Sequence, residues 1–104
     1  MQKSNLYEVK LEERVLDDFE EAFLYYESIS PALADNFTRM FLLAIEKLSA
    51  TPHHYFNITK KLKRITLGKF PYLLVYKIHG NDVIVAGLFH RASKPTKWRK
   101  KIIS

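Results

Sequence analysis

The spacing of apolar residues changes along the chain, and these changes predict where its secondary structure lies. Residues 6–11 alternate between apolar and polar side chains, which is typical of a half-buried strand. After residue 14 the apolar residues return every three or four positions, as they do on one face of an α-helix. The predicted apolar stripe of this first helix comprises Val15, Leu16, Phe19, Ala22, Phe23, Tyr26 and Ile29. Acidic residues occupy the opposite side of the helix.

Ser30 and Pro31 mark the start of a second helix. Serine is a good N-cap, and proline fits the first helical position because its missing N–H has no partner there. The second apolar stripe comprises Leu33, Phe37, Met40, Phe41, Ala44, Ile45 and Leu48, and it ends before Thr51-Pro52. Two helices with so short a connection are expected to form an antiparallel hairpin.

The second half of the chain has the pattern of a β-sheet. A polar loop is expected from His53 to Lys60, followed by strands over residues 62–68, 71–78 and 83–90. Residues 79–82 form a turn signal, and Gly87 inside a strand suggests a bulge or a close approach of the backbone. The predicted order is β-α-α-β-β-β. The chain is therefore expected to be a single α+β domain spanning residues 1–104, with a helical hairpin on one face of a small, mostly antiparallel sheet.

Charge divides the chain in the same place. Residues 1–50 contain five Lys or Arg and ten Asp or Glu, whereas residues 51–104 contain twelve Lys or Arg and the single acid Asp82. The net charge of +6 therefore hides a strongly basic C-terminal half. Such asymmetry favours a surface for a polyanion or an acidic protein, although a solvated basic surface without a ligand is the alternative.

Composition limits the remaining classes of function. The chain has no cysteine, which excludes disulfides and thiolate metal sites, and it has no apolar run of about 18 residues that predicts a membrane span. No secretory signal is evident at the N-terminus, so a cytoplasmic location is expected. His53, His54 and His79 lack nearby acids in a ligand pattern, so neither a metal nor a cofactor is expected.

Two motifs resemble the RelE/ParE superfamily of type II toxin–antitoxin toxins. The segment from Arg64 to Tyr76 contains G-x-F-P-Y-x-x-x-Y, which is similar to a hairpin of this superfamily. The ending H-R-x-x-x-P-x-x-W, which begins at His90, resembles the ParE branch. The resemblance covers nearly the whole chain and implies the fold expected above.

The resemblance implies a toxin, and it leaves the target open. ParE-like toxins block DNA gyrase, whereas RelE-like and YoeB-like toxins cleave mRNA on the ribosome. Members of both branches inhibit growth and are neutralised by a cognate antitoxin, which is usually acidic. The ParE-like interpretation is preferred because no tyrosine follows residue 82, whereas the mRNA-cleaving branches carry a C-terminal tyrosine. An mRNA interferase and an inactive relative of the family are the alternatives.

Site residues follow from these alternatives. As an interferase, the protein would use Arg64, His90 and Arg91 for catalysis, provided that the sheet brings them together. Alternatively, His90 bonds only to backbone, and Arg64 pairs with the acidic helix face. Residues predicted to bind the target or the antitoxin are Lys61, Lys63, Arg64, Arg91, Lys94, Lys97, Trp98, Arg99 and Lys100.

Overall fold

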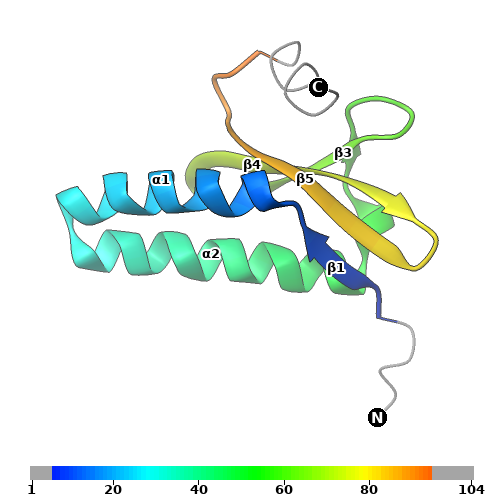
Figure 1. The fold of residues 1–104 in the computed structure, drawn as a ribbon, viewed down its shortest axis with the longest axis horizontal. Helices are drawn as coiled ribbons and strands as arrows, with labels where there is room; N and C mark the ends of the chain where they lie inside the picture. Colours follow the sequence, from blue (N-terminus) through cyan, green and yellow to red (C-terminus); the bar gives the residue numbers. More distant parts are fainter. Residues whose placement is uncertain (1–5, 95–104) are drawn as a thin grey trace.

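The computed structural model describes residues 6–94, which form two helices packed against one face of a five-stranded sheet (Figure 1). The elements in chain order are β1 (Glu8–Leu11), α1 (Glu13–Ile29), α2 (Pro31–Ala50), the 3₁₀ helix η1 (Pro52–His54), β2 (Phe56–Asn57), β3 (Lys63–Leu67), β4 (Phe70–His79) and β5 (Asp82–His90). The strands lie in the order β1-β5-β4-β3-β2, with β1 parallel to β5 and the other pairs antiparallel. The predicted α+β fold is confirmed.

One segment of the prediction was incomplete. The expected polar loop from His53 to Lys60 contains η1 and the short strand β2, which pairs with β3. Both residues of β2 are exposed, so no alternation of apolar and polar side chains marks this strand in the sequence. Pairing with β3 alone defines it.

The connection between the helices is the single residue Ser30. Its side chain accepts a hydrogen bond from the backbone N–H of Leu33 at 3.3 Å, and Pro31 occupies the first turn of α2, as predicted. The predicted apolar stripe of α1 was wrong at its margins, because Leu16 is 51% exposed and Ile29 is 58% exposed. Leu16 lies about 100° around the helix from buried Val15, and Ile29 ends α1 at the tip of the hairpin, which projects past the sheet (Figure 1).

Both faces of β4 are buried. Leu74 and Tyr76 belong to the main core under the helical hairpin, whereas Leu73 and Val75 face the other side and pack with Phe89. Ile58 and Leu62, from the segment between β2 and β3, pack against this second cluster. Four consecutive residues of β4 are therefore buried, although antiparallel sheets commonly leave one face to solvent.

A β-bulge adjusts β5 to this arrangement. Val75 pairs with Gly87 and Tyr76 pairs with Val85, so Ala86 is the additional residue. The ring of Phe89 occupies the space beside Gly87, where a Cβ atom would lie 2.3 Å from the ring. The bulge expected near Gly87 is confirmed, whereas the group that approaches Gly87 closely is the Phe89 side chain and not a backbone.

A buried hydrogen bond joins the sheet to the end of the helical hairpin. The hydroxyl of Tyr76 donates to the backbone carbonyl of Pro52 at 2.6 Å, and Tyr76 is completely buried. Burial raises the pKa of Tyr76 far above its ordinary value of 10.0. The hydroxyl therefore remains a donor throughout the neutral range.

We expect Tyr76→Phe to lower the free energy of unfolding by about 1–3 kcal/mol, because it leaves the buried Pro52 carbonyl without its partner. Urea denaturation measures this difference. Tyr25→Phe removes a hydroxyl from a side chain that is 60% exposed, and we expect a change within about 0.5 kcal/mol. Equal stability of Tyr76→Phe and the unaltered protein would show that the hydrogen bond contributes nothing.

Stability should also fall as the pH rises above about 10. Burial is the largest cause that raises the pKa of Tyr26, Tyr72 and Tyr76, so the unfolded chain releases protons that the folded chain retains. Unfolding is therefore favoured at increasing pH. Denaturation between pH 8 and 11 should show a shallower loss for Tyr76→Phe than for the unaltered protein, and parallel curves would contradict this assignment.

Candidate binding surfaces

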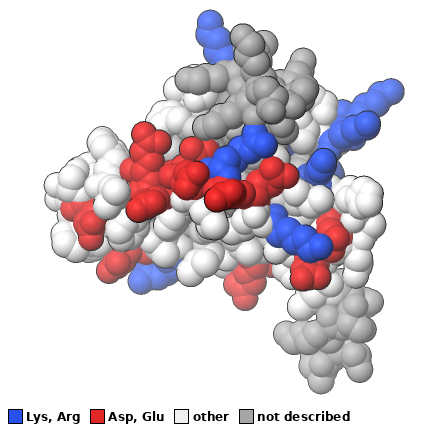
Figure 2. All heavy atoms as spheres, viewed as in Figure 1, with Lys and Arg blue, Asp and Glu red and all other residues white. Residues whose placement is uncertain are grey.

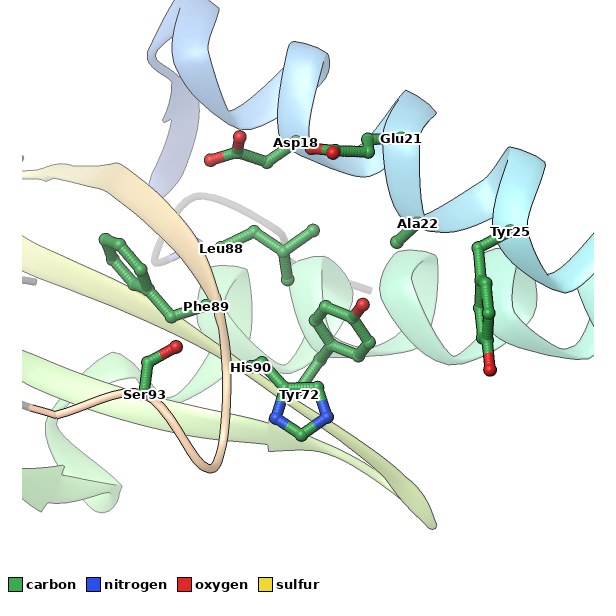
Figure 3. A pocket seen from close by; sticks show the side chains of 9 residues that line it. All are labelled: Asp18, Glu21, Ala22, Tyr25, Tyr72, Leu88, Phe89, His90 and Ser93. Atoms are coloured by element: carbon green, nitrogen blue, oxygen red, sulfur yellow. The ribbon is translucent and has the colours of Figure 1, made fainter.

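The end of β5 forms one side of a surface cavity of about 380 Å³ (Figure 3). Helix α1 supplies the opposite side, and the start of β4 lies between them. The cavity is lined by Asp18, Glu21, Ala22, Tyr25, Tyr72, Leu88, Phe89, His90 and Ser93. Of these residues only His90 was expected at a site, because the acids of α1 follow the ordinary pattern of a solvated helix face.

His90 is held in one orientation at this cavity. Its Nδ1 accepts a hydrogen bond from the backbone N–H of Ala92 at 3.0 Å, and its ring lies edge-on to Tyr72 with centroids 5.2 Å apart. In the neutral imidazole, Nε2 therefore carries the proton. Burial, with Glu21 as a second cause, raises the pKa of Tyr72, so its hydroxyl stays protonated at neutral pH. The backbone bond anticipated for His90 is present.

The electrostatics of the cavity do not favour a phosphate. Figure 2 shows a band of acidic side chains over α1. Two acids of α1, Asp18 and Glu21, line the cavity beside His90. Carboxylates repel an anion, and the repulsion grows where water is partly excluded. This cavity therefore suits a cationic or hydrogen-bonding group of a partner better than the phosphate of an RNA backbone.

Arg64 lies on the other face of the sheet. Arg64 pairs with Val75 of β4, which in turn pairs with Gly87 of β5, and the side chain of Val75 lies on the face away from the helices. The Arg64 guanidinium lies 5.3 Å from the centre of the Phe56 ring. His90 pairs with Tyr72, which packs against the main core. The two residues are thus three positions and two strands apart, roughly 14 Å between Cα atoms, with side chains on opposite faces.

The structure does not bring Arg64 and His90 together, nor does it pair Arg64 with the acidic face of α1. Among residues 6–94, the ion pairs join Lys10 to Asp82 and Arg14 to Glu12, and Arg64 contacts Phe56 instead. The interferase interpretation expected Arg64 and His90 to meet on one concave surface. The strand register prevents this.

The other predicted basic residues are spread over both ends of the sheet. Arg91 and Lys94 are exposed just after β5, where the Arg91 backbone N–H bonds to the Pro71 carbonyl at 2.7 Å. Lys61 and Lys63 line a separate cavity at the far end of β4. The remaining predicted residues, Lys97, Trp98, Arg99 and Lys100, lie outside the described part of the chain.

An apolar groove lies where the tip of the helical hairpin meets the turn between β3 and β4. It encloses about 600 Å³ and is lined by Tyr26, Leu33, Asn36, Met40, Gly68, Lys69, Phe70 and Pro71. The sequence indicated most of these residues as core or turn. The G-x-F-P-Y motif is the signal that could have located the groove, since Gly68 has a positive φ of 59° and turns the chain there.

Between residues 6 and 94, no helix is long and apolar enough to cross a membrane. The same residues contain no group of three or more His, Cys, Asp or Glu side chains arranged to hold a metal ion.

The same arrangement occurs in solved structures from a bacterial toxin–antitoxin system and of a bacterial toxin. A chain from the chromosomal ParDE toxin–antitoxin system of P. aeruginosa superimposes with a TM-score of 0.71 at 12% identity, covering 83% of this chain and 97% of that one. A mutant of the E. coli toxin RelE in the free state gives a TM-score of 0.60 at 13% identity, covering 94% of this chain and 95% of that one. No curated protein sequence matches the chain significantly. These likenesses define the class as the RelE/ParE toxin fold.

The sequence itself narrows the class further. Residues 9–95 match the model of the ParE toxin of type II toxin–antitoxin systems, parDE. The chain belongs to this family, as the resemblance of its hairpin and C-terminal motifs predicted.

Proposed function

We propose that the protein inhibits growth by binding a macromolecular target without cutting it, and that this target is DNA gyrase. The observation that carries this proposal is the placement of Arg64 and His90 on opposite faces of the sheet. Cleavage of RNA requires an acid, a base and a cation around one phosphate, so groups about 14 Å apart do not serve it. The carboxylate of Glu21, which lines the same cavity as His90, further opposes a phosphate there.

An antitoxin is the natural occupant of the apolar groove in this proposal. Leu33, Met40 and Phe70 offer apolar contacts of the kind that receive an amphipathic helix or an extended segment. Lys69 at the rim, and Arg91 and Lys94 near the start of β4, favour an acidic partner by electrostatic steering. Both the complex and its target would then lie in the cytoplasm.

We expect Leu33→Asp to weaken binding of the cognate antitoxin at least tenfold, because a carboxylate enters an apolar groove and faces an acidic partner. Leu42→Asp is the matched control, since Leu42 is on the same helix, is 59% exposed and does not line the groove. Titration calorimetry with the cognate antitoxin measures both. Equal losses of antitoxin affinity in the two variants, with equal melting temperatures, would show that the antitoxin binds outside the apolar groove.

Induced expression in cells tests the target. We expect growth arrest, loss of negative supercoiling in a reporter plasmid and intact ribosome-bound mRNA. His90→Ala should leave these effects unchanged, because His90 has no catalytic task in this proposal.

Two other results would contradict the proposal in different ways. Cleaved mRNA, abolished by Arg64→Ala or His90→Ala, would identify an interferase. Normal growth with unchanged DNA and mRNA would identify an inactive member of the family.

A further inference from the structure

A cavity lined by lysines lies at the end of the sheet where β4 turns into β5. It encloses about 510 Å³ and is lined by His53, Lys60, Lys61, Lys63, Lys77, Ile78 and His79. This lysine cavity is at the opposite end of β4 from the apolar groove, so a ligand bound in it would not depend on the function proposed above.

The protein does not neutralise the charge of the lysine cavity, whose lining contains no acid. Asp82 is the single acid of residues 51–104, and its carboxylate accepts a hydrogen bond from Lys10 at 3.2 Å. Among residues 6–94, Lys60, Lys61 and Lys77 form no ion pair. An anion bound between these lysines would remove the repulsion among their like charges.

One of the four ammonium groups is held in place. The Nζ atom of Lys63 donates to the backbone carbonyls of Tyr55 at 3.0 Å and His53 at 3.4 Å. An ammonium group has three donors, so one remains for a ligand. The end of α2 and the start of β3 therefore fix one cation of the lysine cavity before any ligand binds.

The turn that carries Lys60 and Lys61 is ordered as well. The hydroxyl oxygen of Thr59 accepts hydrogen bonds from the backbone N–H groups of Lys61 and Leu62, both at 3.1 Å. The backbone N–H of Ile58 donates to the carbonyl of Leu62 at 2.7 Å, which closes the turn. Ile58 and Leu62 also pack against the buried cluster on the face of the sheet away from the helices. A backbone that is ordered before binding lowers the entropic cost of holding a ligand.

The composition of the lining favours phosphate over carboxylate. A phosphate group carries about 1.5–2 negative charges and three acceptor oxygens, whereas a carboxylate carries one charge and two oxygens. Phosphate groups therefore neutralise several cations around a small volume better than carboxylates do. The lining has no arginine, which binds carboxylates with two parallel bonds, whereas lysine binds phosphate as a point charge. A peptide segment would need apolar anchors, and Ile78 is the only apolar residue of the lining.

We propose that the lysine cavity binds a compact anion with adjacent phosphate groups, such as a diphosphate or a triphosphate. The fixed ammonium group of Lys63 contacts one phosphate, and Lys60, Lys61 and Lys77 neutralise the remaining charge. The volume of the cavity is within the range of small-ligand sites.

Titration calorimetry with sodium tripolyphosphate tests the proposal on the purified protein. We expect Lys61→Gln combined with Lys77→Gln to weaken binding at least tenfold, because two of the neutralising charges are lost. The matched control combines Lys69→Gln with Lys94→Gln, which remove the same charge near the other end of β4, and its affinity should change less than threefold. Equal weakening by the two double variants would show that only net charge matters and would overturn the proposal.

Thr59→Ala tests the ordered turn without removing a charge. We expect it to weaken tripolyphosphate binding at least threefold, whereas Thr59→Ser keeps the acceptor oxygen and should change the affinity less than twofold. Equal affinities of these two variants would contradict the role of the turn. Circular dichroism checks that every variant is folded, and Lys61→Gln alone, with an expected loss of about threefold, replaces the double variant if that one unfolds.

Citrate and adenosine triphosphate identify the chemistry of the ligand. Citrate offers carboxylates only and should bind at least tenfold more weakly than tripolyphosphate. Adenosine triphosphate should bind within threefold of tripolyphosphate, because the lining offers a base a single apolar residue. The assignment to phosphate groups would be overturned by citrate binding as tightly as tripolyphosphate, by a preference above tenfold for adenosine triphosphate, or by no binding of millimolar tripolyphosphate.

Discussion

The burial of β4 on both faces is the constraint on which the rest of the structure depends. Four consecutive side chains, from Leu73 to Tyr76, have almost no contact with solvent. Burying a large apolar side chain contributes about 1.5–3 kcal/mol, so this short segment makes a large share of the stabilising contacts. Ionised groups have no place along it, because burying an unpaired charge is very costly. The polar chemistry of the protein therefore lies at the ends and edges of the sheet.

The two ends of β4 differ in charge as a result. At its start, Tyr72 meets His90 and the acids of α1. At its other end, Lys77 and His79 meet the lysines that precede β3. A ten-residue strand spans roughly 30 Å, which exceeds the Debye length of about 8 Å at physiological salt. The charges at the two ends therefore act largely independently, and the net charge of +6 describes neither end.

The likeness to toxins at 12–13% identity shows how little of this fold depends on particular side chains. The apolar pattern, the one-residue connection at Ser30 and the bulge at Ala86 all contribute to the packing of the two helices on the sheet. The fold does not determine the functional site, because function depends on particular residues that the fold carries. In this chain the register that buries β4 also separates Arg64 from His90.

The sequence by itself determined both helices and every strand except β2, together with the helical hairpin, the turn at Gly80 and the irregularity at Gly87. These features depend on local periodicity and on residues with special backbone preferences. It also identified the family through its hairpin motif. Tertiary structure alone decided that Leu16 and Ile29 are exposed, because Leu16 lies about 100° around α1 from buried Val15 and Ile29 ends α1 at the tip of the hairpin, which projects past the sheet. It also decided which basic residues lie together, because pairing between strands distant in sequence sets both the face and the end of the sheet that each side chain occupies.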